Sequence, residues 1–264
     1  LRVIPVKVMN LDQLGLPPVL KKIAAEERGL VLVTGTTGSG KSTSLAAMID
    51  YINAHKTAHV ITIEGPIEYL HKDNQCIINQ REIGVDTRSF AYALRSALRQ
   101  DPDVILVGEM RDLETIQTAI TAAETGHLVF GTLHTTGAAR TINRMVDAFP
   151  VEQQEQIRAQ LSTALLAVIS QALLPKAGGS GVVAGCEIMI ITDAIAHNIR
   201  ENQTHKITSS IQTGANVGMI LLDDFLYNLF LQKKITYQTM MGAAQNPADL
   251  ETKVKEYTYA AQKK

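Results

Sequence analysis

The sequence is poor in cysteine, and it lacks both the long apolar runs of membrane proteins and the basic surplus of many nucleic-acid-binding proteins. Its 264 residues include no Trp and two Cys, Cys76 and Cys186, which are far apart and outside any Cys-x2-Cys pair. A four-cysteine zinc site is therefore impossible, and a disulfide framework is not expected. No stretch approaches the ~18 consecutive apolar residues of a membrane span. With 25 Lys and Arg against 26 Asp and Glu, the chain lacks the basic surplus that drives nonspecific nucleic-acid binding.

Hydrophobic residues are abundant. They make up 45% of the sequence, and charged residues make up 19%, which excludes a disordered chain and allows a sizeable core. No signal-peptide pattern is seen, so a reducing, cytoplasmic setting is expected. The sequence starts with Leu1 rather than Met, as we expect for a piece of a longer protein.

Strands and helices are predicted to alternate in the first half. Continuous apolar runs, typical of buried parallel strands, lie at residues 30–34, 59–63, 104–107 and 127–133. Helical patterns occupy residues 42–55, 86–100 and 113–123, and a helix opened by Pro17 or Pro18 runs to about Arg28. Residues 2–8 are predicted as a short strand without a partner. The alternation predicts an α/β fold with a mostly parallel sheet and helices on both faces.

The pattern changes after Pro150. Residues 151–171 are predicted to form one long helix, and residues 175–181 a flexible turn before a strand at residues 182–184. From Thr192 onward the sequence predicts mostly short helices. We favour their packing on the core over a partner-docking surface around Arg200 and Glu201.

The strongest functional signal is a glycine-rich segment between a predicted strand and a predicted helix. It matches the P-loop pattern Gly-x4-Gly-Lys-Ser/Thr. The candidate nucleotide-binding residues are Gly35, Thr36, Thr37, Gly38, Ser39, Gly40, Lys41, Ser42 and Thr43. Backbone N–H groups and the positive end of the following helix would surround phosphate oxygens of ATP. Lys41 would reach the β- and γ-phosphates, and Ser42 would hold Mg²⁺. The alternative is a chance glycine-rich turn.

Acidic residues follow two of the predicted strands. Glu109 comes after the apolar run at residues 104–107, in the Walker B arrangement, where it would bind Mg²⁺ partly through water or polarise the attacking water. Glu64 follows the run at residues 59–63, and Glu68 lies just beyond it. The alternatives are a surface salt bridge for Glu109 and a solvated loop for Glu64, and spacing alone does not decide the second case.

Histidines and arginines give weaker signals. His127 and His134 bracket a predicted strand, and His134 could contact a γ-phosphate, although a lone His is more often structural or exposed. The remaining histidines form no metal-ligand pattern. Arginines that act in trans on a neighbour's ATP are also possible. The candidates are Arg81, Arg95 and Arg99, and the sequence alone does not choose among the arginines.

Four segments, taken in order, resemble those of the secretion ATPases of type II secretion systems and type IV pili. They are the P-loop, an "Asp box" at residues 64–68, the Walker B segment at residues 101–109 and a "His box" at residues 125–134. The runs at residues 108–115 and 121–136 are most similar to the pilus retraction ATPases. The resemblance extends over nearly the whole chain.

The resemblance implies an ATPase with a RecA-like P-loop NTPase fold. It implies that residues 1–10 are the last strand of a PAS-like N-terminal domain, residues 11–190 the ATPase core and residues 191–264 a C-terminal helical part. Glu64 would activate water, Glu109 would be the Walker B acid, and His134 would sense phosphate. ATP and Mg²⁺ are the implied cofactors.

The implied assembly is a homo-hexamer of the full-length protein. It would act on an inner-membrane platform protein, and indirectly on pilin, from the cytoplasmic face of the membrane, with no nucleic-acid partner. Pilus retraction is the expected function.

Two departures from the family pattern bear on that expectation. The family's Glu-Asp-Pro reads Glu64-Gly65-Pro66 here. Loss of a carboxylate beside the candidate base predicts weaker hydrolysis with ATP binding retained. The retraction motif Ala-Ile-Arg-Asn-Leu-Ile-Arg-Glu is matched at five of eight positions in residues 194–201, with Ala196 in place of the first Arg.

Three other functions stay open. An assembly or type II secretion ATPase typically carries a four-cysteine zinc insertion, which this chain cannot form. A hydrolytically weak regulatory paralogue is motivated by Gly65. A RecA-like DNA motor is disfavoured by the neutral charge and by the His box.

Overall fold

A single sheet organises the chain, of which the computed structural model describes residues 8–262. Its seven strands lie in the order β3-β2-β4-β5-β1-β6-β7. The strands are β1 (Gly29–Thr34), β2 (His59–Glu64), β3 (Ile77–Glu82), β4 (Val104–Val107), β5 (Leu128–Leu133), β6 (Leu165–Pro175) and β7 (Val182–Ile190). All neighbouring pairs are parallel except β6 and β7, which form an antiparallel hairpin. The predicted α/β fold is confirmed, whereas residues 2–7 of the predicted N-terminal strand lie outside the described residues.

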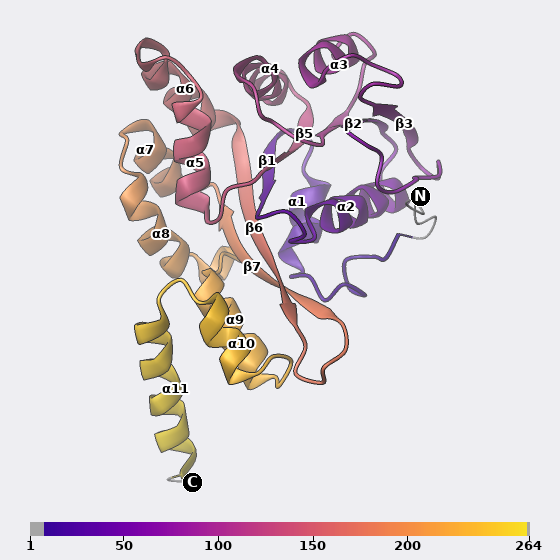
Figure 1. The fold of residues 1–264 in the computed structure, drawn as a ribbon. Helices are drawn as coiled ribbons and strands as arrows, with labels where there is room; N and C mark the ends of the chain where they lie inside the picture. Colours follow the sequence, from indigo (N-terminus) through magenta and orange to yellow (C-terminus); the bar gives the residue numbers. More distant parts are fainter. Residues whose placement is uncertain (1–7, 263–264) are drawn as a thin grey trace.

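Helices cover both faces of this sheet (Figure 1). They are α1 (Val19–Ala25), α2 (Lys41–His55), α3 (Phe90–Ala97), α4 (Leu113–Glu124), α5 (Ala138–Asp147), α6 (Val151–Ala164), α7 (Asp193–Arg200), α8 (Ile207–Thr213), α9 (Leu222–Leu231), α10 (Tyr237–Ala243) and α11 (Pro247–Gln262). Two short 3-10 turns, Thr204–Lys206 and Ala215–Val217, flank α8.

The alternation of side chains along β1 shows how the two layers form. Leu30 and Leu32 point into the cluster shared with α3 to α8, and Val31 and Val33 point into the cluster shared with α1 and α2. Successive side chains of a strand face opposite sides, so a continuous apolar run is required where both faces are covered. The central parallel strands therefore have no solvent-exposed face that would call for polar side chains.

The long helix predicted at residues 151–171 is wrong in its second half. Helix α6 ends at Ala164, and the chain continues directly as strand β6, which lies beside β1. The segment from Leu165 is apolar at almost every position, and such a run does not distinguish a buried strand from a buried helix by periodicity. The position between β1 and β7 decides the matter, because it is covered on both faces.

Other boundaries also differ from the predictions. The helix predicted at residues 86–100 is shorter, since Ser89 caps α3 by accepting the N–H of Tyr92. Strand β7 extends well beyond residues 182–184 to Ile190. Strand β3 and helix α5 were not predicted at all. The remaining predicted strands and helices of the first half are present within a few residues of the expected bounds.

The C-terminal helices divide into two groups. Helices α7 and α8 pack on the main sheet cluster, whereas α9, α10 and α11 gather around Leu174 at the end of β6 in a separate cluster. Figure 1 shows α11 reaching away from the body. The expected short helices are confirmed, and the domain boundaries at residues 10 and 190 stay predictions. Among the described residues, no helix is both long enough and apolar enough to cross a membrane.

Candidate functional site

A cavity of about 540 Å³ opens at the carboxyl ends of the parallel strands, next to the start of α2. It is the position where open α/β sheets bind ligands. Its walls are formed by Thr37, Gly38, Ser39, Gly40, Lys41, Ser42, Thr43, Leu45, Ala46, Glu64, Gly65, Pro66, Glu68, Tyr69, His71, Phe90, Leu106, Gly108, Glu109, Thr132, His134 and Leu173. Most predicted nucleotide-binding residues and all three predicted catalytic residues therefore share one cavity. Gly35 and Thr36 belong to the same loop but are not part of its walls.

The P-loop holds its lysine in place without a ligand. Lys41 Nζ donates hydrogen bonds to the carbonyl oxygens of Gly35 at 2.8 Å and Thr36 at 3.0 Å. Burial lowers the pKa of Lys41, although the carboxylates of Glu109 and Glu68 act in the opposite direction. A partly desolvated ammonium group facing the cavity is well suited to bind phosphate oxygens.

Glycine is required at two points of this loop by close approach as well as by backbone conformation. Gly35 and Gly40 have φ values of 139° and 87°. A Cβ at Gly35 would lie 2.3 Å from the carbonyl oxygen of Gln171, and one at Gly40 would lie 2.7 Å from its Nε2. Both glycines therefore let the P-loop pack directly against β6.

Gln171 is a buried residue that sequence reasoning missed. Its Nε2 donates to the carbonyl oxygen of Ser39 at 2.9 Å, and its Oε1 accepts from Ser44 Oγ at 2.7 Å. One side chain of β6 thus joins the P-loop to the first turn of α2. The residue was hidden inside the helix wrongly predicted at residues 151–171, and a correct strand assignment would have placed it beside β1.

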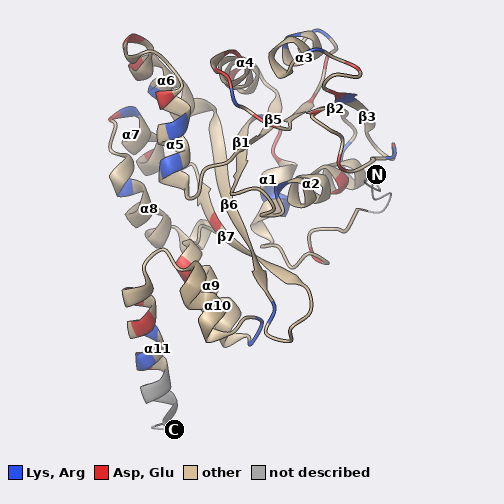
Figure 2. Cartoon of the chain, viewed as in Figure 1, with Lys and Arg blue, Asp and Glu red and all other residues tan. Residues whose placement is uncertain are grey.

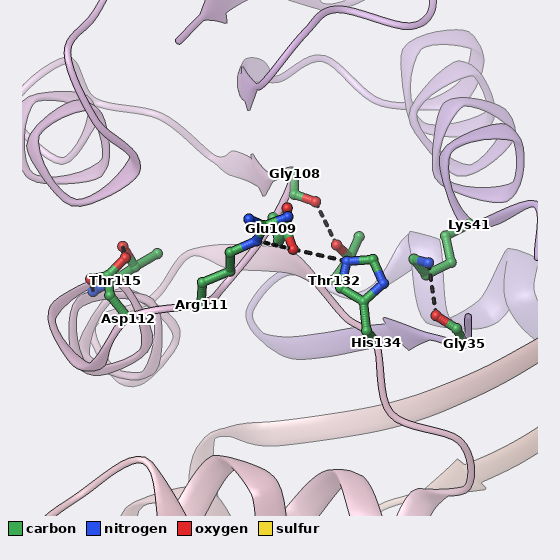
Figure 3. A network of polar contacts seen from close by, with 9 residues as sticks. All are labelled: Gly35, Lys41, Gly108, Glu109, Arg111, Asp112, Thr115, Thr132 and His134. Atoms are coloured by element: carbon green, nitrogen blue, oxygen red, sulfur yellow. Dashed lines mark hydrogen bonds and ion pairs between the residues drawn. The ribbon is translucent and has the colours of Figure 1, made fainter. Parts of the chain in front are cut away.

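Glu109, the predicted Walker B acid, lies at the centre of a polar cluster beyond the end of β4 (Figure 3). Its Oε1 accepts hydrogen bonds from Arg111 Nε and, at 2.8 Å, from His134 Nε2. Burial raises the pKa of Glu109, but these hydrogen bonds and the charges of Arg111 and His134 outweigh it and lower the pKa below its ordinary value. Glu109 is therefore an anionic acceptor for cations and water at neutral pH.

Glu64 is held separately at the end of β2. Its Oε1 accepts from Thr62 Oγ1 at 2.6 Å and from Gln80 Nε2 at 3.1 Å, and its Oε2 accepts from the N–H of Glu68 at 3.4 Å. The carboxylate is thus oriented by β2, β3 and the loop that follows β2.

Gly65 leaves an open space next to this carboxylate. A Cβ added there would meet the Phe90 ring at 3.4 Å and Ile83 at 3.5 Å, which are ordinary contacts. A second cavity of about 390 Å³ lies between Gly65, Pro66, Ile83, Phe90, Glu109 and Arg111. Nothing in the backbone or in the packing therefore requires glycine at this position.

The candidate trans arginines lie outside both cavities. Arg95 forms an ion pair with Glu114 of the same chain, which ties α3 to α4. Arg81 and Arg99 are exposed on β3 and after α3. Arg111 is not one of these three candidates, yet it contacts Glu109 directly. Its position two residues after the predicted Walker B acid is the local signal that could have identified it.

The oxygen donors around the cavity suit Mg²⁺ better than a transition metal. In the part of the chain that the structure describes, no group of three or more His, Cys, Asp or Glu could hold a metal. The hydroxyl of Ser42 and the carboxylate of Glu109 line the cavity, and Mg²⁺ commonly takes one or two protein oxygens together with water and phosphate. These residues fit a magnesium ion that arrives with a nucleotide.

Comparison with known proteins agrees with this geometry. The family described as "Type II/IV secretion system protein" matches residues 1–241. The chain belongs to this family. The chain is 55% identical over 246 residues to the Pseudomonas aeruginosa "Type IV pilus retractation ATPase PilT", covering 93% of this chain and 71% of that protein.

Further relatives point the same way. A Neisseria gonorrhoeae "Twitching motility protein" is 56% identical over 245 residues, covering 93% of this chain and 66% of that protein. A solved structure described as the pilus retraction motor PilT with bound ADP has 52% identity and a TM-score of 0.89, covering 95% of this chain and 71% of that chain. Within the type II/IV secretion family, the chain is a PilT-like ATPase, and its sheet has the fold expected for a RecA-like P-loop NTPase.

Proposed function

We propose that this chain is the ATP-hydrolysing part of a ring motor that retracts type IV pili. One observation carries the proposal: Lys41, Glu64, Glu109 and His134 come from four separate segments and meet at one cavity beside the P-loop. The similarity to PilT proteins supports the biological assignment. The ring would be a homo-hexamer that acts on a membrane platform protein from the cytoplasmic side.

Each residue has a proposed role in hydrolysis. Residues 35–43, Lys41 in particular, would bind the phosphates, and Ser42 and Glu109 would hold Mg²⁺, in part through water. The ion would neutralise charge on the phosphates when bound. Glu64 accepts a proton from the attacking water, because its carboxylate is oriented by three hydrogen bonds. His134 connects Glu109 to the phosphate end of the cavity and senses the γ-phosphate.

A complete site needs a cation from a neighbouring subunit. Arg81 and Arg99 are the better trans candidates, since Arg95 is paired within its own chain. Completion in trans predicts that activity depends on assembly.

The test is the Mg²⁺-dependent rate of ATP hydrolysis per subunit, measured over a range of protein concentrations. We expect the rate to rise with concentration and to be lost in Lys41→Ala. Glu64→Gln should lower the rate by about 10²–10⁴-fold while leaving ADP affinity unchanged, and exposed Glu155→Gln is its matched control. ADP binding without hydrolysis at any concentration would favour the regulatory paralogue instead.

A further inference from the structure

Helix α5 begins at Ala138, four residues after His134, and its start lacks a local cap. The N-cap residue is Gly137, which has φ of 87° and no side chain to accept the first N–H groups. Both Gly137 and Ala138 are buried, so water does not replace the missing cap. Buried backbone N–H groups need partners, and here they come from strands far away in the sequence.

The partners are two side chains on adjacent strands. Ser170 Oγ of β6 accepts the N–H of Gly137 at 2.8 Å, and Glu187 Oε1 of β7 accepts the N–H of Ala138 at 2.7 Å. Ser170 and Glu187 are paired residues in the antiparallel hairpin, so they present their side chains on the same face. Together they replace a local cap.

Glu187 is an unusual residue for its place. It is only 5% exposed, and it is the one charged residue of β7. In Figure 2, where Asp and Glu are red and uncharged residues are tan, the sheet is mostly tan. A buried carboxylate is costly unless it is hydrogen-bonded, and its second oxygen accepts from Gln245 Nε2 at 3.4 Å. The negative charge also lies at the positive end of the α5 dipole, where it is stabilised.

The segment between His134 and α5 has little freedom. Thr135 Oγ1 and Thr141 Oγ1 are 2.8 Å apart, and Thr141 Oγ1 also donates to the carbonyl oxygen of Gly137 at 2.8 Å. At the other end, His134 Nε2 contacts Glu109. Because only three residues lie between His134 and Ala138, a shift of the α5 start moves the His134 ring relative to Glu109.

We propose that Glu187 is a positioning residue that fixes His134 against Glu109 by holding the start of α5. This rests on the proposed hydrolytic function of the site. The P-loop is held by Gln171, whose side chain lies on the opposite face of β6 from Ser170. Loss of Glu187 should therefore affect the hydrolytic step and leave nucleotide binding intact.

The experiment compares Glu187→Ala, Glu187→Gln and Ile188→Ala in the natural gene product that carries this chain. Misplacement of a catalytic group by about 1 Å can cost a factor of ~100. We expect Glu187→Ala to lower kcat at least tenfold with Kd for ADP within twofold. Glu187→Gln keeps an oxygen for the Ala138 N–H and should retain at least half of kcat. Ile188 follows Glu187 in β7 and packs in the hydrophobic cluster on the opposite face of the sheet. Ile188→Ala should therefore leave kcat within twofold.

A second readout follows His134 itself. Ring-nitrogen NMR signals of His134 in this chain should move in Glu187→Ala and stay in place in Glu187→Gln. The proposal is overturned if kcat of Glu187→Ala stays within twofold, if Glu187→Gln falls equally far, or if Ile188→Ala mimics Glu187→Ala. If the natural protein binds ADP but does not hydrolyse ATP, the proposed function fails. In that case the NMR readout still tests the positioning role, because unmoved His134 signals in Glu187→Ala would overturn it.

Discussion

The two walls of the cavity are built in different ways. The P-loop wall is packed against β6, with no room for a Cβ at Gly35 or Gly40 and with buried hydrogen bonds to Gln171. The wall at Gly65 is open, and a second cavity lies beyond it. The P-loop is thus preorganised within the chain, whereas the wall that carries Glu64, for which we propose water activation, has space for a further side chain.

The largest effect on nucleotide affinity is expected from adding a side chain to the packed wall, which has no room for one. Gly35→Ala should lower ADP affinity by about 100-fold, because overpacking and a left-handed backbone each cost about 1–3 kcal/mol. Isothermal titration with ADP measures this. Gly126→Ala is the matched control, since Gly126 also has a positive φ but no atom near its would-be Cβ. Equal losses in the two variants would mean that the packing against β6 is unimportant.

The second effect concerns the side chain that holds the packed wall. Gln171→Leu leaves the Ser39 carbonyl and the Ser44 hydroxyl without their partner, at about 1–3 kcal/mol of unfolding free energy for each group. Denaturant unfolding measures the loss. The same replacement on α6, Gln160→Leu, should cost less than about 1 kcal/mol. A Gln171→Leu protein as stable as the natural one would remove Gln171 from the P-loop support.

The rate of hydrolysis should rise when a side chain is added to the open wall at Gly65. Gly65→Asp restores the family's carboxylate at a position with ordinary contact distances, and we expect hydrolysis to rise by roughly 3- to 10-fold through better orientation of Glu64. Gly65→Asn has the same size without the charge and separates orientation by bulk from electrostatics. An unchanged steady-state rate in Gly65→Asp would show that glycine is simply tolerated here.

The smallest expected effect is a pH dependence of folding stability that arises from Glu109, which lines both cavities. Its pKa is lowered in the folded protein, so its stabilising contribution is fully present above the unfolded pKa of about 4.3. The contribution is lost as the pH falls through the lowered folded pKa. The stability difference between the natural protein and Glu109→Gln should therefore shrink below about pH 4 in urea titrations. Arg111→Ala should reduce the same difference, and a difference that grows on acidification would contradict this account.

Much of the site could be predicted from the sequence, because the residues that form it belong to local sequence patterns. The P-loop needs small residues at fixed spacing between a strand and a helix, and residues 35–43 show that spacing. Glu64 and Glu109 follow apolar strands, and parallel strands end at a common edge. Those features place three elements at one cavity without any knowledge of distant contacts.

The β6–β7 hairpin could not be obtained in this way. Its first strand is apolar at most positions, and such a run has no period that separates a buried helix from a buried strand. Gln171, Ser170 and Glu187 gain their roles only because the hairpin lies beside β1 and under α5. Their partners are 33 to 132 residues away in the chain.

The amino-acid sequence by itself therefore determined the nucleotide chemistry and the α/β class, since both follow from residue types at short, fixed spacings. The tertiary structure alone decided what supports that chemistry. It paired Glu109 with His134, packed β6 against the P-loop and brought a buried carboxylate to the start of α5. The physical reason is that burial and long-range hydrogen bonding depend on which strands become neighbours, and no local pattern encodes that choice.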